Sequence, residues 1–483
     1  MYQKITGTMQ LLIMKYIKEA DMTQSGFIVA IDLGTTKISG IIGRKNENDV
    51  FSVLHHESLP SENSIRRGTI YNIDKAGAIV KKLISILENK MNVRIGKVYV
   101  SLAGQSVHTL IVKEERDLTE KGGIVTDAVI AELYNAAMQF KPDLKNNYSI
   151  ADVEYFIDNK PEINPVGVTC DKIEAVFRIV VGRPNLFANI ERVISKSNLE
   201  IVDYIVSPLA AADITLTEEE KDLGCAFVDF GGGTTEVSIY KSGILRHLVT
   251  IPFGGRNITR DICELNFVET DAEIYKKKFG KAKEGNEGFA FASPFTSKPD
   301  IDLVELNKVI VLRWDEIALN IKEQIRLSGY ANELGSGIVI TGGASRLKNL
   351  DLYLTQKLNM PIRKASAKKT LINNFADLVS DPSMTSLLGV FVKGEENCEY
   401  IKPKVVIEKP VYEEPTRWTE PPKTEEVKTD RGSKRWGGFF GSKDSDKEKK
   451  QPKPPKEQKS QNKFGDTMKD MFSNMFEDPD DKN

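Results

Sequence analysis

Two short stretches rich in glycine and threonine have the composition of turns that bind phosphate groups. The first contains Asp32, Gly34, Thr35, Thr36 and Lys37, and the second contains Asp229, Gly231, Gly232, Gly233, Thr234 and Thr235. Glycine lets backbone N–H groups approach a ligand closely, and threonine adds hydroxyl donors. The aspartate at each preceding strand end could hold the water shell of Mg²⁺, which prefers oxygen ligands.

The two turns differ in how strongly they indicate a ligand. Taken alone, the first fits a plain hairpin turn about as well as a phosphate site. In the second, three consecutive glycines cost conformational entropy and offer no side chain for packing. A backbone of this kind usually lies against a ligand, so the pair predicts a phosphate clamp with two sides.

A third stretch, residues 338–345, runs from an apolar strand through Gly342 and Gly343 to Ala344. A helix that begins there presents free N–H groups and a partial positive charge. The glycine pair allows the backbone to approach a ring or a ribose.

The elements that must position these turns form an internal repeat. Residues 27–42 read FIVAIDLGTTKISGII, and residues 225–240 read CAFVDFGGGTTEVSIY. Each is an apolar strand, an aspartate, a turn and a second strand, which predicts two homologous halves that face one another. Alternating strand and helix patterns predict an α/β architecture. Strands are expected at 27–32, 37–43, 97–102, 175–181, 201–205, 225–230, 235–240, 245–251 and 337–341, and helices near 74–90, 127–139, 185–197, 208–214, 257–264, 303–327 and 347–356.

Composition limits the class of protein. The 483 residues include 67 Lys and Arg against 69 Asp and Glu, a formal net charge of −2. This balance argues against a nucleic-acid partner, which needs a basic excess. No apolar run approaches the ~18 residues that span a bilayer. The four cysteines have no zinc-ligand spacing, which favours reduced, buried thiols.

The two ends of the chain differ in composition from the middle. Residues 1–25 are expected to be disordered or a mis-assigned start, with Met22 a plausible true start and a short surface helix as the alternative. Nine of the 20 prolines lie in the last 81 residues. Such a segment buries too little apolar surface to offset its ordering entropy, so 396–460 is predicted to be a disordered linker.

The last segment predicts an amphipathic helix at 461–479. Its apolar residues fall within an arc of about 140° when plotted at the helical period. They are Phe464, Met468, Met471, Phe472, Met475 and Phe476. This pattern favours a helix that lies in a membrane interface, although its polar face is acidic and linker lysines would have to attract anionic lipids. A helix docked on its own globular domain is the alternative.

Across residues 26–395, the three turns in this order resemble the actin-like ATPases, which include sugar kinases and heat-shock chaperone ATPases. Among these, the chain is most similar to the FtsA family of bacterial cell division proteins. The similar stretches are SPLAAA at 207–212, LGC at 223–225, GILRH at 243–247 and GIVITGGA at 337–344. An insert between Gly104 and Ala175 sits where that family carries its distinctive subdomain.

The resemblance implies an actin-like ATPase fold of two related halves around a nucleotide cleft. The first two turns would bind the phosphates of ATP, Asp32 and Asp229 would hold Mg²⁺ through waters, and Gly342, Gly343 and Ala344 would meet the adenosine. Glu273 and Lys276 would meet the ribose and adenine. The implied parts are the first half at 26–104 and 176–215, the inserted subdomain at 105–175, the second half at 216–255 and 316–395, and a small subdomain at 256–315.

The resemblance also implies a function. It predicts a protein that binds ATP, polymerises at the cytoplasmic face of the inner membrane and anchors FtsZ filaments at the division septum. The expected partners are the C-terminal peptide of FtsZ, further copies of the chain, anionic lipids and other divisome proteins, with Arg313 as a contact for FtsZ. Where cytoskeletal relatives such as MreB place an acid that orients the attacking water, this chain has Ser207, which predicts slow hydrolysis.

Three alternatives remain open at this point. A small-metabolite kinase would need a catalytic aspartate between the phosphate turns, and the sequence offers no supported candidate. A chaperone would need a substrate-binding domain after the ATPase core. A membrane-bound cytoskeletal protein of the MreB type would lack the insert at 105–175 and the long tail.

Overall fold

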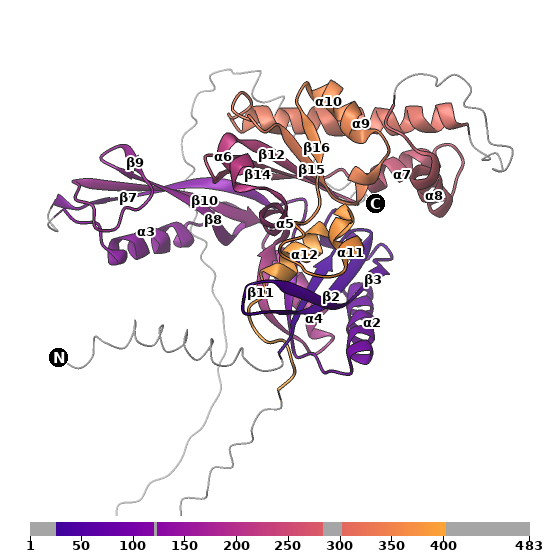
Figure 1. Ribbon diagram of the computed structural model, residues 1–483, viewed down its shortest axis with the longest axis horizontal. Coiled ribbons are helices and arrows are strands. Elements are labelled where there is room, and N and C mark those ends of the chain that lie inside the picture. The colour runs from indigo at the N-terminus through magenta and orange to yellow at the C-terminus, as the bar shows by residue number, and fades with distance from the viewer. Residues whose placement is uncertain (1–25, 120–122, 284–301, 402–483) are drawn as a thin grey trace, which may run out of the picture. The chain divides into compact units, whose positions relative to one another are not determined.

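The computed structural model describes residues 26–119, 123–283 and 302–401 (Figure 1). The chain divides into two compact units, Met1–Ile401 and Lys402–Asn483, and every described residue belongs to the first. The predictions for residues 1–25, for most of the linker 396–460 and for the helix at 461–479 lie outside the described residues. No described helix is long and apolar enough to cross a membrane.

The first half is built on a five-stranded sheet of order β11-β6-β1-β2-β3. Strand β1 pairs parallel with β6 and antiparallel with β2, so the first predicted hairpin is confirmed. Helices α2 and α4 pack together, and α2 contacts β2 and β3. The elements are β1 (Ile28–Leu33), β2 (Lys37–Lys45), β3 (Phe51–Pro60), β4 (Ile65–Arg66), β5 (Thr69–Ile70), α2 (Ile73–Met91), β6 (Lys97–Leu102), α4 (Asn185–Ser195) and β11 (Glu200–Val206).

The second half repeats this topology. Its strands follow the order β16-β15-β12-β13-β14, with β12 parallel to β15 and antiparallel to β13. All six residues of β12 are buried, as expected for a strand covered on both faces. The elements are β12 (Cys225–Phe230), β13 (Thr235–Lys241), β14 (Ile244–Ile251), α7 (Gly255–Cys263), α8 (Glu269–Phe279), α9 (Leu303–Leu327), β15 (Ile338–Thr341), η2 (Gly343–Arg346), α10 (Leu350–Leu358) and β16 (Ile362–Lys364).

The inserted subdomain forms four antiparallel strands with one helix against them. It comprises β7 (His108–Asp117), α3 (Asp127–Gln139), β8 (Asn146–Ile157), β9 (Lys160–Glu162) and β10 (Lys172–Gly182). Figure 1 shows α3 along the strands, in agreement with its contacts to β7, β8 and β10. The subdomain follows β6 in sequence, yet its strand β7 bridges to β14 of the second half through His108 and Val249. Strand β10 runs past residue 175, the expected end of the insert.

Two helices connect the halves. Helix α5 (Ser207–Thr215) contacts β13 and α12 (Thr385–Val392) contacts β1, β2 and β6, and the two helices pack on each other. A Cβ atom on Gly389 would lie 2.6 Å from the carbonyl carbon of Ala210. Glycine is therefore required where α12 crosses α5. Three further short helices complete the connections: α6 (Glu218–Leu223), α11 (Ala376–Ser380) and η3 (Pro382–Met384).

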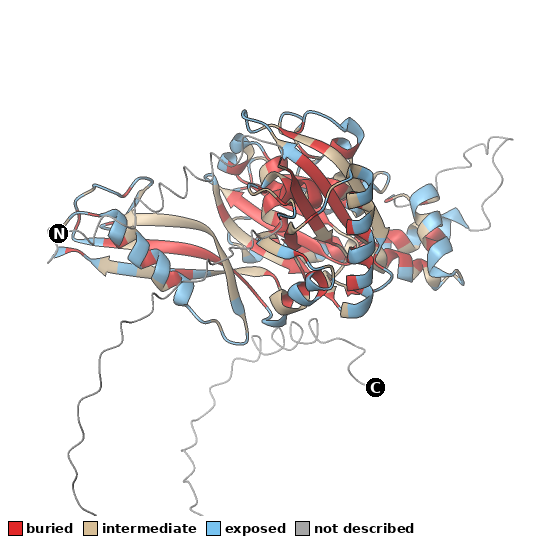
Figure 2. Cartoon of the chain, turned by 90° about the horizontal axis from the view of Figure 1, so that it is seen from below, coloured by how far each residue is buried: buried red, intermediate tan, exposed pale blue. Residues whose placement is uncertain are grey.

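The hydrophobic core of the first half extends to Phe227, Tyr240 and Val339 of the second half. A further core lies within the second half and another within the inserted subdomain, and the buried residues follow the strands in Figure 2. Trp314 of α9 is fully buried and meets Phe230 of β12 edge to face, with ring centroids 5.0 Å apart. Phe177 of β10 is fully buried in the inserted subdomain. The α/β architecture of two related halves is thus confirmed.

The predicted strands and helices agree with the structure to within a few residues, but several strands were not predicted. Strands β3, β7 and β8 have mostly intermediate burial, because they lie at sheet edges or in a thin subdomain. Their apolar residues do not alternate cleanly, so the sequence carries no strong strand signal there.

Candidate functional site

The two predicted phosphate turns lie against each other. The first joins β1 to β2 and the second joins β12 to β13. A Cβ atom on Gly232 would lie 2.4 Å from Cγ2 of Thr36, and one on Gly233 would lie 2.7 Å from Cγ2 of Thr35. The two halves therefore meet at the turns, and no side chain larger than hydrogen fits the second turn at these positions.

The strands that lead into these turns each carry a carboxylate as their next-to-last residue, Asp32 in β1 and Asp229 in β12. Burial raises the pKa of Asp32, while a hydrogen bond with Ser101 and the charge of Lys37 lower it. Burial and the charge of Asp32 raise the pKa of Asp229 to about 6. The Ser386 hydroxyl donates to Oδ2 of Asp229 at 2.8 Å. Because the charge of Asp32 raises the pKa of Asp229, the two carboxylates lie close enough to repel each other.

A third carboxylate, Glu236, was missed from the sequence. It lies on β13 directly across from Asp229 in the β12–β13 register, and it is buried. Burial and then the charge of Asp229 raise the pKa of Glu236 to about 8. The sequence feature that could have identified Glu236 is its position directly after the second turn. The residues that follow it in the strand, as far as Tyr240, are apolar or carry a hydroxyl group.

This arrangement fits a hydrated divalent cation. In the part of the chain that the structure describes, no group of three or more His, Cys, Asp or Glu residues could hold a metal ion by itself. The two carboxylates Asp32 and Asp229 suit a cation such as Mg²⁺, which keeps several waters and takes further oxygen ligands from a phosphate. A cation here would also relieve the repulsion between the two buried carboxylates.

Several of the predicted turn residues are engaged within the protein. The backbone N–H of Gly68 donates to Oγ1 of Thr35 at 2.9 Å, and the Thr235 hydroxyl donates to the Phe253 carbonyl at 2.9 Å. Nζ of Lys37 donates to Oγ of Ser383 at 3.2 Å, which ties the first turn to η3. These contacts hold the turns in shape, and the backbone N–H groups of the turns are the donors that could bind a phosphate. The Gly231 amide is an exception, because it bonds to the Thr234 carbonyl at 2.9 Å within the turn.

The third turn packs on the second. Gly342 has a φ of 88°, and a Cβ atom there would lie 2.2 Å from Oδ1 of Asp229. Strand β15 runs parallel to β12 and sets Thr341 beside Asp229. The glycine is therefore required both by its backbone conformation and by the approach of Asp229.

Helices α7 and α8 bring Glu273 and Lys276 close to the second and third turns. Nζ of Lys276 donates to the Gly255 carbonyl at 2.7 Å and pairs with Glu273 at 2.6 Å. The Gly255 N–H donates to the Gly231 carbonyl at 3.0 Å, and a Cβ atom on Gly255 would lie 3.0 Å from Cβ of Ala344. Gly255 was not identified from the sequence as a site residue, although the glycine pair that it forms with Gly254 could have indicated a close backbone approach.

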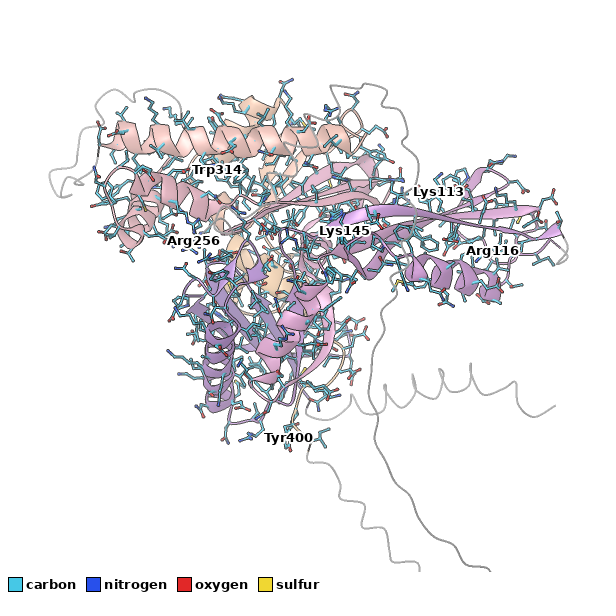
Figure 3. The ribbon with its side chains drawn as sticks, turned by 180° about the vertical axis from the view of Figure 1, so that it is seen from behind. Lys113, Arg116, Lys145, Arg256, Trp314 and Tyr400 are labelled. Carbon is cyan, nitrogen blue, oxygen red and sulfur yellow. The ribbon has the colours of Figure 1, made fainter. Side chains whose placement is uncertain are left out.

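The start of α7 also anchors the second turn. The backbone N–H of Arg256 donates to the Gly232 carbonyl at 2.7 Å, and its guanidinium pairs with Glu269 at 2.6 Å. Figure 3 shows Arg256 where the two halves approach each other. The second turn is thus fixed from the side of α7 and from the side of the third turn.

Two further predicted residues lie elsewhere in the fold. Ser207 is the first residue of α5 and is buried. The Arg313 guanidinium makes two hydrogen bonds to Asp261, from Nε at 2.6 Å and from Nη2 at 2.8 Å, and a third to Glu316. The six apolar residues of the predicted tail helix lie outside the described residues.

Two sheets of the same strand order, with paired glycine turns between them, define an actin-like protein of two related halves. The family model described as "Cell division protein FtsA" matches residues 226–389. The cell division protein FtsA of Porphyromonas gingivalis is 30% identical over 384 residues, covering 77% of this chain and 79% of that protein. FtsA of Escherichia coli K12 is 24% identical over 397 residues, covering 78% of this chain and 92% of that protein.

The chain therefore belongs to the FtsA family of cell division proteins. Among solved structures, the PilM-PilN type IV pilus biogenesis complex has a chain with a TM-score of 0.53 at 14% identity, covering 76% of this chain and 98% of that chain. That likeness shows the shared fold alone.

The raised pKa values predict how stability depends on pH in the protein without metal or nucleotide. The folded state keeps protons on Glu236 and Asp229 that the unfolded state releases at lower pH, so stability should fall as the pH rises through about 5 to about 8. Glu236→Gln should remove the larger share of this loss and exceed the parent in stability by more than about 1 kcal/mol at about pH 8.5. Urea unfolding across this pH range measures the effect.

The exposed Glu305→Gln on α9 serves as the matched control and should follow the parent at every pH. A Glu236→Gln variant with the same pH profile as the parent would contradict the raised pKa of Glu236.

Proposed function

We propose that this cell division protein binds ATP between its halves, polymerises at the cytoplasmic membrane and anchors FtsZ filaments there. The observation that carries the proposal is the contact between the two glycine turns, each of which follows a buried strand and a desolvated aspartate. A site shared by two halves makes their relative position depend on what is bound between them.

The chain's own residues have distinct parts in this site. Backbone N–H groups of the two turns hold the phosphates, and Asp32 and Asp229 hold the waters of Mg²⁺. The residues Gly342, Gly343 and Ala344 lie under the adenosine, and Glu273 and Lys276 meet the ribose and adenine. When bound, Mg²⁺ supplies positive charge that offsets the phosphate oxygens and the two carboxylates.

Hydrolysis is expected to be slow. The start of α5 offers the Ser207 hydroxyl, which is a poor general base compared with a carboxylate. ATP therefore serves to set a conformation that polymerises, and its bound lifetime is long relative to an ordinary enzyme turnover.

Membrane attachment is assigned to the helix at 461–479, with the linker lysines attracting anionic lipids. A single helix of this size binds weakly, but a polymer presents many linked copies and so binds strongly. Polymerisation and membrane attachment would then reinforce each other at the division septum.

FtsZ binding is assigned to the small subdomain at 256–315, with Arg313 at its edge. The guanidinium of Arg313 is already oriented by Asp261 and Glu316. Because the ion pairs of Arg313 are partly exposed, a carboxylate of an acidic peptide could replace Asp261 or Glu316 as its partner. The Arg313 side chain would keep its orientation.

A bulky residue in the second turn should weaken ATP binding. Gly232→Val would place side-chain atoms in the space occupied by Thr36, so the turns would separate and ATP affinity should fall by at least about tenfold. Titration with a fluorescent ATP analogue in the presence of Mg²⁺ measures this affinity. Gly329→Asn, in an open turn with a φ of 83° that asparagine tolerates, is the control. Equal ATP affinity in Gly232→Val and the parent would refute the site.

The amphipathic tail should be required for membrane binding. Deleting residues 463–483 should release the chain from vesicles that contain anionic phospholipid, as measured by co-sedimentation. Phe472→Glu adds a charge to the apolar side and should also release it, whereas Ser473→Glu adds the same charge to the polar side and should bind nearly as well as the parent. Vesicle binding that survives the deletion would remove the anchor assignment.

The partner is tested by the binding of a labelled FtsZ C-terminal peptide to the full chain with ATP present. An affinity in the micromolar range, about −8 kcal/mol, is expected, and Arg313→Gln should weaken it by about tenfold. Arg326→Gln, on the same helix and paired with Glu323 at 2.6 Å, is the matched control. Absence of peptide binding when ATP is bound would leave a membrane-associated actin-like protein with another partner.

A further inference from the structure

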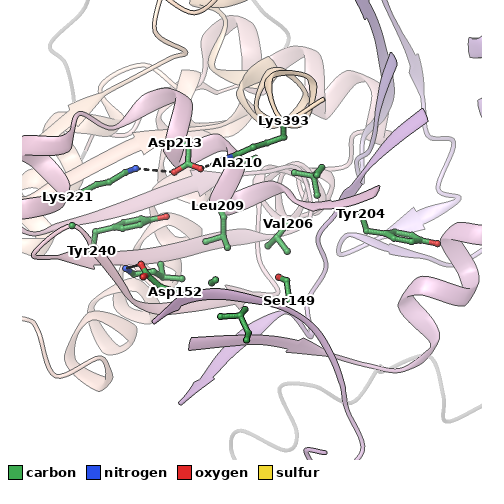
Figure 4. Close-up of a pocket in the computed structure, with 15 residues that line it drawn as sticks. Ser149, Asp152, Tyr204, Val206, Leu209, Ala210, Asp213, Lys221, Tyr240 and Lys393 are labelled. Atoms are coloured by element: carbon green, nitrogen blue, oxygen red, sulfur yellow. Dashed lines mark hydrogen bonds and ion pairs between the residues drawn. The ribbon is translucent and has the colours of Figure 1, made fainter. Parts of the chain in front are cut away.

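A cavity of about 350 Å³ lies where the first half, the second half and the inserted subdomain meet. Figure 4 shows its walls, which come from β8, β11, α5, α6, β13, β14 and the residue after α12. None of the residues assigned to the nucleotide site lines it. Its volume falls at the lower end of the range for small-molecule sites.

The hydroxyl of Tyr240 points into this cavity without a protein partner. The Tyr240 side chain is only 5% exposed, and Figure 4 shows its oxygen directed toward Leu209. Among the described residues, none hydrogen bonds to this hydroxyl. Burial and then the charge of Asp213 raise the pKa of Tyr240 well above its ordinary value, so the hydroxyl keeps its proton and is a donor. A donor that faces a cavity from a buried side chain, without a protein acceptor, is free to bind an acceptor placed in that cavity.

The end of the cavity next to Tyr240 carries an excess positive charge. Asp213 pairs with Nζ of Lys221 at 3.1 Å and with Nζ of Lys393 at 2.7 Å, so two ammonium groups face one carboxylate. Glu218 also lies 3.5 Å from Lys221, but its side chain is 79% exposed and its effect is screened by water.

The opposite wall adds no net charge. Asp152 accepts the backbone N–H groups of Leu245 and Val153, each at 2.9 Å. Behind it, Arg178 and Arg246 each pair with Glu154 at 2.6 Å, so two cations and two carboxylates balance. Among the residues that line the cavity, Lys221 and Lys393 thus balance Asp152 and Asp213, and both ammonium groups lie at the end next to the free Tyr240 hydroxyl.

The remaining walls are apolar. Val206, Leu209 and Ala210 line one side, and Leu245 lines the other. Ala210 and Leu245 are almost fully buried, so these surfaces are shaped by the surrounding core.

We propose that this cavity binds a small monocarboxylic acid with an apolar body. The carboxylate accepts the Tyr240 hydroxyl and faces Lys221 and Lys393, and the apolar body lies along Val206, Leu209 and Leu245. The ligand contacts both halves at once.

Octanoate is the probe for this site, with octylamine and 1-octanol as ligands of the same length and different head groups. Each is titrated into the full chain without nucleotide, FtsZ or vesicles, and binding is followed by calorimetry and ligand-observed NMR. Octanoate should bind saturably at one site and at least about tenfold more tightly than the amine or the alcohol, because a charge-assisted hydrogen bond and an ammonium group are available only to the carboxylate.

Two variants locate the binding. Tyr240→Phe keeps the buried ring and removes only the hydroxyl, and Lys393→Gln changes an exposed side chain, so both should fold. Each should weaken octanoate binding by about tenfold. Tyr134→Phe and Lys81→Gln make the same changes at exposed positions outside the cavity and should leave octanoate binding unchanged.

Three results would overturn the proposal. They are an absence of saturable octanoate binding, an octylamine affinity equal to that of octanoate, and octanoate binding that Tyr240→Phe leaves intact. Because no nucleotide or partner is present, these results do not depend on the proposed anchoring function.

Discussion

The crossing of α5 and α12 is the contact on which the arrangement of the two halves depends. At the crossing, Gly389 approaches the backbone of Ala210 so closely that a Cβ atom would lie 2.6 Å from its carbonyl carbon. Helix α5 contacts β13 of the second sheet and β11 of the first, and α12 contacts β1, β2 and β6 of the first, so the crossing of the helices lies between the two sheets. Because protein interiors are close-packed, a wider crossing would move one half relative to the other. The contact of Gly232 and Gly233 with Thr36 and Thr35 requires this narrow separation.

The buried carboxylates beside the paired turns add an electrostatic constraint. Burial raises the pKa of Asp32, Asp229 and Glu236, and the charge of Asp32 raises the pKa of the other two further. Lys37 is a nearby cation that lowers the pKa of Asp32, and its ammonium group bonds to Ser383. Carboxylates buried without full compensation are costly, so a structure retains them where function uses their charge. A hydrated divalent cation with a phosphate chain would compensate the carboxylates and satisfy the backbone donors of the turns together. The cost of burying these carboxylates and the affinity for the proposed ligand thus have one origin.

The local parts of this design could be predicted from the sequence, and the parts that depend on register could not. The hairpins at 27–42 and 225–240, the aspartates before the turns and the helix at 303–327 follow from short-range patterns, and the structure has them where they were expected. Glu236 was missed because its importance comes from the β12–β13 register, which sets it opposite Asp229. Gly255 was missed because only packing shows that it lies between Lys276, Ala344 and the second turn. Strands β7 and β8 were missed because a thin subdomain buries too few side chains to impose a clear alternation.

Helix α5 connects the proposed nucleotide site to the cavity. Ser207 is the first residue of α5, and Asp213 lies near its end and forms ion pairs with Lys221 and Lys393. A helix of nine residues that is almost wholly buried moves as a rigid body, so a shift at one end displaces the other. A ligand that contacts both halves has different affinities for their different separations, and it can shift the equilibrium only by that difference. Any change that bound ATP makes in the affinity of the cavity for its ligand would then be matched by an equal change, in free energy, that this ligand makes in the affinity for ATP. The proposed carboxylic acid site and the paired glycine turns therefore both depend on the distance between the halves, which the close approach of Gly389 to Ala210 limits.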